Sequence, residues 1–312
     1  MREPYAAGKF YTDNKEELIN QLRELFHRAE SMLKNKNNNA SKATGIISPH
    51  AGYFFSGLAA AEAYNYLKNS HYDSFVILGV DHTGLAYNDY AVSIEDWKTP
   101  LGIVRADLEL ANRITKNANI AQNNDAHKFE HSIEVQLPFL QMIFKEPRIV
   151  AITAGRYDNL INKQIAQAIK EEAEKGKSIC VIASSDFTHY GYDYGFVPFE
   201  NNDSKALRKS IMALDFGAIQ YIKNLDSQGF LGYVEKTGAT ICGVYTIAAI
   251  IDIINELEEK KDKISVEVVD YYTSADILKD NSNSVSYAAI LFNKNKTISQ
   301  KDNKTTKDNQ NN

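Results

Sequence analysis

Apolar residues recur along the chain with two periods, one typical of amphipathic helices and one typical of buried strands. Between residues 14 and 33 they return every three or four positions, after a capping-box pair at Asp13 and Glu16, which predicts a helix. Short runs rich in Val and Ile follow, and they predict strands over 44–48, 74–80, 148–153, 178–183, 264–272 and 285–292. Helical patterns separate these runs, at 57–68, 107–117, 131–143, 158–175, 203–223 and 243–259.

This alternation predicts an α/β fold in which a mixed β-sheet carries helices on both faces. No composition shift and no linker rich in Pro, Gly or Ser divides residues 1–292, so we expect a single domain there. The Asn/Lys-rich segment 34–41 predicts a surface loop. The stretch 293–312 has one Ile as its only large apolar residue, and we expect a disordered tail because it has too little apolar surface to bury.

Composition and charge narrow the class of protein without naming a function. The chain has 35 basic and 40 acidic residues, a net charge of −5, and no long basic run in the part expected to fold, which argues against nucleic acid as the main partner. The longest nearly apolar stretch, 241–251, is shorter than the roughly 18 residues that suggest a membrane span. The N-terminus lacks the apolar core of a signal peptide, and two cysteines cannot build a disulfide framework. We therefore expect a cytoplasmic protein with reduced thiols, with Cys180 buried in the core.

Three candidate metal ligands come from widely separated parts of the chain. His50 and His82 each follow a predicted strand, and in an α/β sheet the functional crevice lies outside the carboxyl ends of the strands. Cys242 comes much later, and Zn, Fe and Cu all accept imidazole and thiolate ligands. The three predict a metal site if the strand ends converge. Other interpretations stay open: His50 could cap a turn, His82 could pair with Asp81, and Cys242 could fill the core.

A second cluster follows the strand predicted at 178–183. Asp186 and His189 leave the same edge of the sheet as the two earlier histidines. An acid three residues from a histidine can orient it as a general base, or can position a substrate. The competing interpretation is that Ser185 or Asp186 caps a short helix.

A third cluster lies at the start of the helix predicted over 131–143. Glu130, His131 and Glu134 fall within five residues and precede an apolar run, which suggests the polar end of a helix facing a cleft. The alternative is an ordinary charged first turn that suits the helix dipole. The remaining histidines lack such placement, and we expect surface roles for His27, His71 and His127.

Together these segments resemble the Memo family, which is related to the LigB-type class III extradiol dioxygenases and belongs to the AmmeMemoRadiSam group. The resemblance runs through residues 1–292, in blocks at 2–11, 49–53, 99–102, 130–139, 184–190 and 240–243. It implies a LigB-like fold. It also implies that the metal ligands are His50, His82 and Cys242, and that the same cleft is lined by His131, Asp186 and His189.

Two positions depart from these relatives. Asp81 precedes His82 where Pro-Asn or Pro-Ser would be expected before the histidine, and its charge could orient the imidazole or alter which metal is held. Cys242 occupies the place of the carboxylate of the dioxygenases. A thiolate is softer and oxidisable, so it favours Cu(I), Zn or redox-active Fe over an oxygen-rich site.

The leading hypothesis is therefore a metal-binding protein that carries out an oxygen- or redox-linked reaction on a small molecule. Iron is the expected metal, and copper or zinc would also fit the ligands. His189 is the expected acid/base, and Asp186 its orienter.

Two further hypotheses come from other classes. The cleft could bind a peptide or protein partner without catalysis, using aromatic contacts from Tyr53, Phe54 and Phe55. The AmmeMemoRadiSam resemblance implies a radical-SAM protein and an AMMECR1-type protein as partners to look for. Alternatively, two histidines and a cysteine could hold a catalytic zinc for hydrolysis, with Glu130 or Glu134 as the base.

Overall fold

Four parallel strands form the centre of a mixed β-sheet in the computed structural model, which describes residues 1–33, 42–87, 89–199, 203–258 and 264–294. The sheet order is β10-β11-β1-β8-β2-β7-β3-β6, in which β1, β8, β2 and β7 run parallel to one another. β11 runs antiparallel to both β1 and β10, whereas β3 runs antiparallel to β7 and parallel to β6. The strands of the main path are β1 (Ala43–Ser48), β2 (Ser74–Val80), β3 (Tyr90–Ser93), β6 (Ala121–Gln122), β7 (Arg148–Ala154), β8 (Ile179–Ser184), β10 (Ile264–Thr273) and β11 (Asn283–Lys294). Beside this path lie β4 (Trp97–Thr99), β5 (Gly102–Ala106) and β9 (His189–Gly191).

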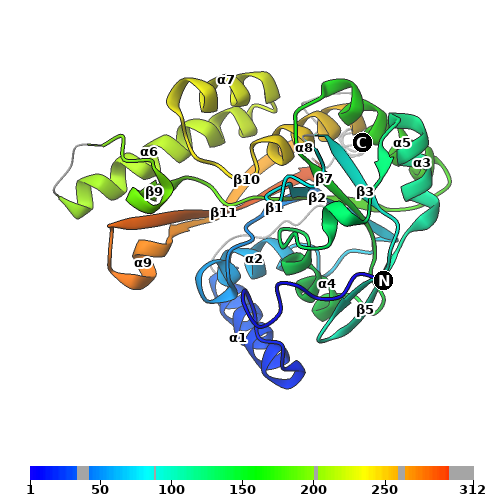
Figure 1. Cartoon of the computed structure of the whole chain (residues 1–312), viewed down its shortest axis with the longest axis horizontal. Helices are drawn as coiled ribbons and strands as arrows, with labels where there is room; N and C mark the ends of the chain where they lie inside the picture. The colour runs from blue at the N-terminus through cyan, green and yellow to red at the C-terminus, as the bar shows by residue number, and fades with distance from the viewer. Residues whose placement is uncertain (34–41, 88, 200–202, 259–263, 295–312) are drawn as a thin grey trace, which may run out of the picture.

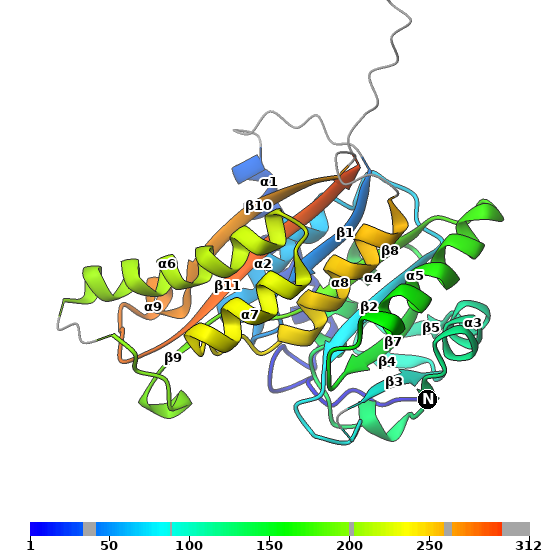
Figure 2. The same ribbon diagram turned by 90° about the horizontal axis from the view of Figure 1, so that it is seen from above.

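Helices cover both faces of this sheet (Figures 1 and 2). One face carries α1 (Lys15–Leu33), α2 (Tyr53–Asn65) and α4 (Leu137–Ile143). The other carries α3 (Leu108–Ala118), α5 (Asn159–Glu174), α6 (Ser204–Lys223), α7 (Ser227–Thr237) and α8 (Val244–Leu257). A short helix, α9 (Ser274–Leu278), connects β10 to β11, and 3₁₀ turns are η1 (Asp125–His127), η2 (Glu134–Gln136) and η3 (Tyr192–Tyr194).

Two hydrophobic cores lie on the two sides of the sheet, and the central strands supply both. Ile46 packs into the core beneath α1 and α2, whereas the next residue, Ile47, packs into the core beneath α5 and α8. Successive side chains of a strand point to opposite faces, so a strand covered on both sides must be apolar throughout. This is why β2, β7 and β8 read as runs rich in Val and Ile in the sequence. Cys180 in β8 is fully buried, as expected.

The predicted fold class, a single α/β domain with helices on both faces of a mixed sheet, is confirmed. All six predicted strands are present. The prediction missed α7, α9 and the short strands β3, β4, β5, β6 and β9, whose apolar runs are too brief to stand out. The predicted loop 34–41 and residues 295–312 of the predicted tail lie outside the described residues. The tail boundary at 293 was wrong, because Asn293 and Lys294 pair with β10 as the end of β11.

Three helix predictions differ in detail. The helix expected over 57–68 begins at Tyr53. The helix expected over 131–143 is instead a turn, η2 and then α4, which has Pro138 in its first turn, where proline suits a helix start. Asn14, not Asp13, caps α1, since its Oδ1 accepts the backbone N–H of Glu17 at 3.1 Å. None of the described helices combines the length and apolar composition needed to cross a membrane.

A buried carboxylate ties α5 to α3 and to the turn before β8. Glu172 accepts a hydrogen bond from Lys175 at 2.8 Å and forms ion pairs with Arg113 at 2.7 Å and Lys177 at 2.6 Å. Burial by itself would raise the pKa of Glu172, but the hydrogen bonds and charges of these cations outweigh it and lower the pKa to about 2.

Candidate functional site

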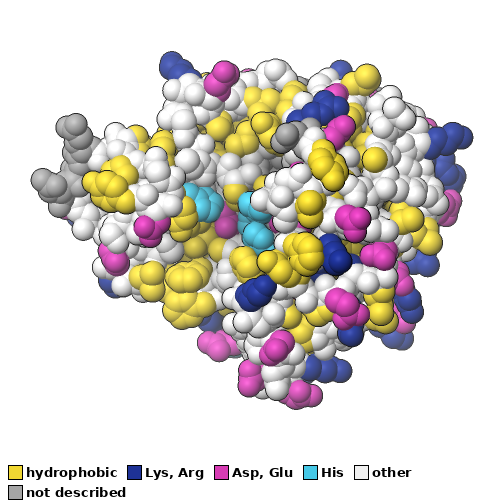
Figure 3. Space-filling view, in the orientation of Figure 1, with side chains coloured by type: hydrophobic (Ala, Val, Ile, Leu, Met, Phe, Trp, Pro, Cys, Tyr) yellow, Lys and Arg dark blue, Asp and Glu magenta, His cyan; other side chains and the backbone are white. Residues whose placement is uncertain are grey.

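His50 and His82 emerge at the same edge of the sheet because their strands end at the same level. β8 lies between β1 and β2, and its residue Ser184 pairs with Ser48 at the end of β1. The rings of the two histidines have centroids 5.3 Å apart and stand nearly perpendicular to each other. Figure 3 shows histidine side chains gathered in a hollow of this face of the molecule.

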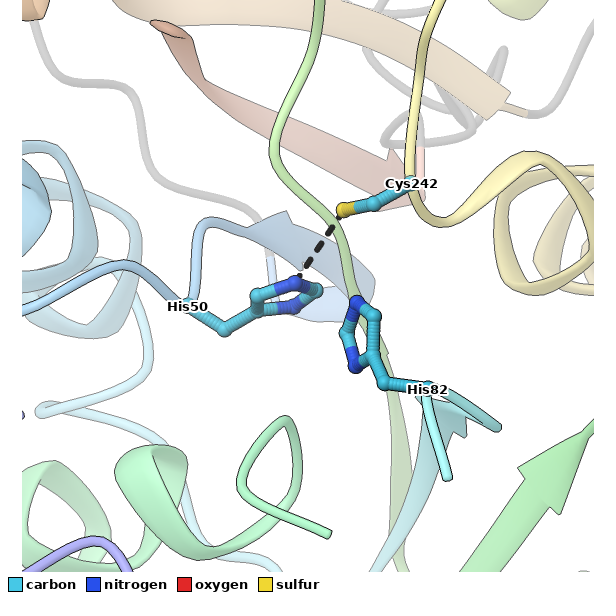
Figure 4. A group of neighbouring side chains, drawn as sticks. All are labelled: His50, His82 and Cys242. Carbon is cyan, nitrogen blue, oxygen red and sulfur yellow. Dashed lines mark hydrogen bonds between the residues drawn. The ribbon is translucent and has the colours of Figure 1, made fainter. Parts of the chain in front are cut away.

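Cys242 reaches this edge from the connection between α7 and α8 (Figure 4). Its Sγ lies 3.1 Å from His50 Nε2 and accepts the backbone N–H of Asp186 at 3.2 Å. The approach requires glycine next in the chain, because a Cβ on Gly243 would lie 2.4 Å from the side chain of Ser185. Ligand atoms of His50, His82 and Cys242 all lie within 4.8 Å of one another.

The hydrogen bonds around His50 decide which of its ring nitrogens is free. Ser184 Oγ donates its single hydrogen to the carbonyl of Ser132 at 2.6 Å and accepts from Gln136 Nε2 at 2.9 Å. His50 Nδ1, 3.0 Å from the same oxygen, must therefore donate, which leaves the lone pair of Nε2 directed at Cys242. Burial lowers the pKa of His50 to about 3, so the ring is neutral, as a metal ligand must be.

A buried carboxylate orients His82. Glu130 accepts from His82 Nδ1 at 3.0 Å, from the backbone N–H of His82 at 2.8 Å and from that of Ser132 at 2.9 Å. Burial would raise the pKa of Glu130, but these bonds and two nearby histidines lower it to about 2. Asp81 is not the partner of His82: it accepts from the backbone N–H of Ala86 at 3.1 Å and organises the following loop.

Two more histidines lie next to this group. His131 stacks between Phe10 and His82, with ring centroids 4.2 and 4.7 Å away. Burial lowers the pKa of His131 to about 3. His189 holds its Nδ1 3.0 and 3.1 Å from the backbone carbonyl oxygens of Phe187 and Thr240. Its Nδ1 is therefore the donor, and Nε2 has no hydrogen-bond partner among the described residues.

The side chain of Asp186 hydrogen-bonds to the backbone of His50 rather than to the ring of His189. Its Oδ1 accepts the backbone N–H of His50 at 2.8 Å, and burial raises its pKa. The helix-cap interpretation of Asp186 was wrong, because the segment after β8 continues into strand β9, beginning at His189. Asp215, from α6, supports the same segment by accepting from Thr188 Oγ1 at 2.6 Å, a contact that the sequence pattern did not reveal.

Glu134 does not face the cleft, so that interpretation was wrong. Its side chain is fully buried and pairs with Arg2, and it also accepts the backbone N–H of Tyr5 at 2.8 Å and the hydroxyl of Tyr11 at 2.7 Å. Arg2 further donates to the backbone carbonyl of Glu130 at 2.7 Å. The N-terminal segment is thus fastened to the residues that hold His82.

His127 is also a correction, since it is fully buried rather than at the surface. Its Nε2 lies 3.1 Å from the carbonyl of Ala91, and its ring packs edge-on against Trp97. These tertiary contacts hold the ring in the interior, although its Nδ1 has no hydrogen-bond partner among the described residues. His27 and His71 are exposed, as expected.

Exposed aromatic side chains surround the site residues in the sequence. Of the three predicted aromatic contacts, Tyr53 is buried, Phe55 is half-buried and Phe54 is 68% exposed. Other exposed aromatics lie within five residues of His82, His131, His189 or Cys242; they are Tyr87, Phe129, Tyr192, Tyr194 and Tyr245.

Comparison with known proteins identifies the family. A family model described as "Memo-like protein" matches residues 2–291. The chain belongs to the Memo family. A MEMO1 family protein of Pyrococcus abyssi is 36% identical over 299 residues, covering 94% of this chain and 99% of that protein. A Memo-family relative from Methanopyrus kandleri is 35% identical over 297 residues, covering 93% and 98%.

A solved structure of an uncharacterized Escherichia coli K12 protein is also similar, with a TM-score of 0.45 and 10% identity, covering 80% of this chain and 99% of that one. The family model and the MEMO1 family relatives confirm the predicted resemblance to the Memo family over nearly the whole chain.

Proposed function

We propose that this Memo-family protein binds a transition-metal ion through His50, His82 and Cys242 and acts on a small molecule in an oxygen- or redox-linked reaction. Iron is the proposed metal, and copper or zinc would also accept two imidazoles and a thiolate. One observation carries the proposal: ligand atoms from three distant segments of the chain lie within 4.8 Å of one another.

The spacing of one donor pair supports a single shared ion. Donors bonded at about 2.1 Å (nitrogen) and about 2.3 Å (sulfur) lie roughly 3.1–3.6 Å apart for angles of about 90–109°. The Sγ of Cys242 and Nε2 of His50 are 3.1 Å apart. The Nδ1 of His50 donates to Ser184, and the Nδ1 of His82 donates to Glu130. Such hydrogen bonds orient ligating histidines and leave Nε2 available to an ion.

When bound, an ion would supply Lewis-acid or one-electron chemistry at positions not taken by protein ligands. Burial raises the pKa of the Cys242 thiol, so binding requires that its proton be released. His189 is the proposed acid/base, because its free Nε2 can accept a proton from a substrate hydroxyl. His131 lines the cleft, and Asp186 acts by holding the backbone of His50 in place.

A second candidate function is partner binding at the same cleft, which the exposed aromatics beside the site residues support. A radical-SAM protein and an AMMECR1-type protein are the partners to test first. The zinc-hydrolase alternative loses its proposed bases, since Glu134 is occupied by Arg2 and the N-terminal segment, and Glu130 by His82 and Ser132.

Elemental analysis of anaerobically purified protein tests the proposal. The wild type should carry about one metal ion per chain. The metal content of His50→Ala and of Cys242→Ser should be at least tenfold lower. His71→Ala is the matched control, because His71 is exposed and lies elsewhere. Circular dichroism would verify that each variant is folded. Equal metal content in all four proteins would overturn the proposal.

A further inference from the structure

A groove of about 560 Å³ lies at the other edge of the sheet, away from the candidate metal site. The start of α1, the β4–β5 hairpin, the end of α4 and the turn into β7 form its walls. β7 enters the sheet there at Arg148, whereas His50 and His82 follow the carboxyl ends of strands parallel to β7. A ligand in this groove would therefore leave the histidine cleft uncovered.

The groove combines an apolar floor with a basic rim. The floor consists of Ile19, Leu101, Ile103, Met142 and Pro147. Four cations and a single carboxylate, Glu146, complete the ionisable lining; the cations are Lys15, Arg105, Lys145 and Arg148. Within the described part of the chain, only Arg105 of these cations forms an ion pair, with Asp96.

We propose that this groove binds an acidic segment of a partner protein, which places apolar side chains on the floor and carboxylates against the rim. The argument is charge complementarity: the lining is strongly basic although the whole chain has a net charge of −5. The basic rim cannot be explained as a by-product of overall composition. Ile103 is 45% exposed in this groove, and a purely polar ligand would leave its apolar surface in contact with water.

The arrangement of the cations favours a polypeptide over other anions. All four basic side chains are exposed, and they are spread over three segments of the chain rather than gathered in one loop, as donors to a phosphate usually are. Four cations around an apolar floor do not form the extended basic track that follows a nucleic-acid backbone. An acidic, partly apolar peptide matches both parts of the groove.

Selection from a random peptide library displayed on phage tests this proposal with full-length protein. The groove variant is Lys145→Glu with Arg148→Glu, and the control is Lys205→Glu with Lys209→Glu on α6. All four positions are exposed, and both double variants change the net charge equally. Peptides enriched on the wild type should be rich in Asp and Glu with interspersed apolar residues. Fluorescence anisotropy should show at least tenfold weaker binding to the groove variant and a change within twofold for the control.

The proposal would be overturned by the absence of any enriched peptide, by enriched peptides without acidic bias, or by equal binding to wild type and groove variant. A 20-base-pair DNA duplex that binds more tightly than the peptides, and is lost in the groove variant, would assign the groove to nucleic acid instead. The groove variant should retain the metal content of the wild type. Failure here is thus distinguishable from failure of the proposed metal site.

Discussion

Replacing Glu130 by Gln removes the acceptor that orients the His82 ring while keeping the size of the side chain. Three N–H donors converge on its two carboxylate oxygens, two from His82 and one from Ser132. The single oxygen of an amide cannot serve both sides, and its NH₂ group would face a donor. We therefore expect His82 to lose its fixed orientation.

The magnitude follows from these contacts. Loss of the partner of a ligating histidine typically costs 10–100-fold in metal affinity, about 1.4–2.7 kcal/mol. A buried donor left unpaired costs about 1–3 kcal/mol of folding free energy. Glu130→Gln should therefore lower metal affinity by 10–100-fold and stability by a similar free energy.

Chelator competition under anaerobic conditions would measure the affinity, and urea unfolding of the metal-free protein would measure the stability. Glu134→Gln is the matched control, since Glu134 is equally buried, four residues away, and paired with Arg2. Breaking a buried ion pair costs about 3–5 kcal/mol, so this variant should be less stable yet bind metal within twofold of wild type when folded. Wild-type affinity in Glu130→Gln, or an equal loss in both variants, would refute the assigned role of Glu130.

Two further variants test packing and charge. Gly243→Ala places a Cβ 2.4 Å from Ser185, so it should lower the free energy of unfolding by about 1–3 kcal/mol and displace Cys242. Thermal unfolding should show a lower midpoint, and elemental analysis should show less bound metal. Unchanged metal content would contradict the need for glycine at this position. The pKa of Glu172 is lowered to about 2, so its ionised form stabilises the fold above its ordinary pKa near 4.5, and this contribution is lost as the pH falls toward 2. The gap in unfolding temperature between wild type and Glu172→Gln should therefore be largest near pH 7 and shrink steadily below pH 4.5, and a gap independent of pH would exclude this mechanism.

Local pattern was sufficient for the six long strands, for most of the long helices and for the place of His50 and His82 at the sheet edge. Strands β1 and β2 are largely apolar because both faces of the sheet are covered, and that is visible in the sequence. His50 and His82 directly follow those strands, so their place at a sheet edge could be predicted from the strand ends alone. Nothing local, however, indicated that β8 lies between β1 and β2, although this order brings the two histidines together.

Tertiary structure alone decided which polar residues serve the site. Glu130 and Glu134 look alike in the sequence, yet one orients His82 and the other fastens the N-terminal segment through Arg2. His127 lies in an equally polar stretch and is buried. The physical reason is that a buried carboxylate is tolerated only where partners from distant segments satisfy it, and those partners are set by how the chain packs.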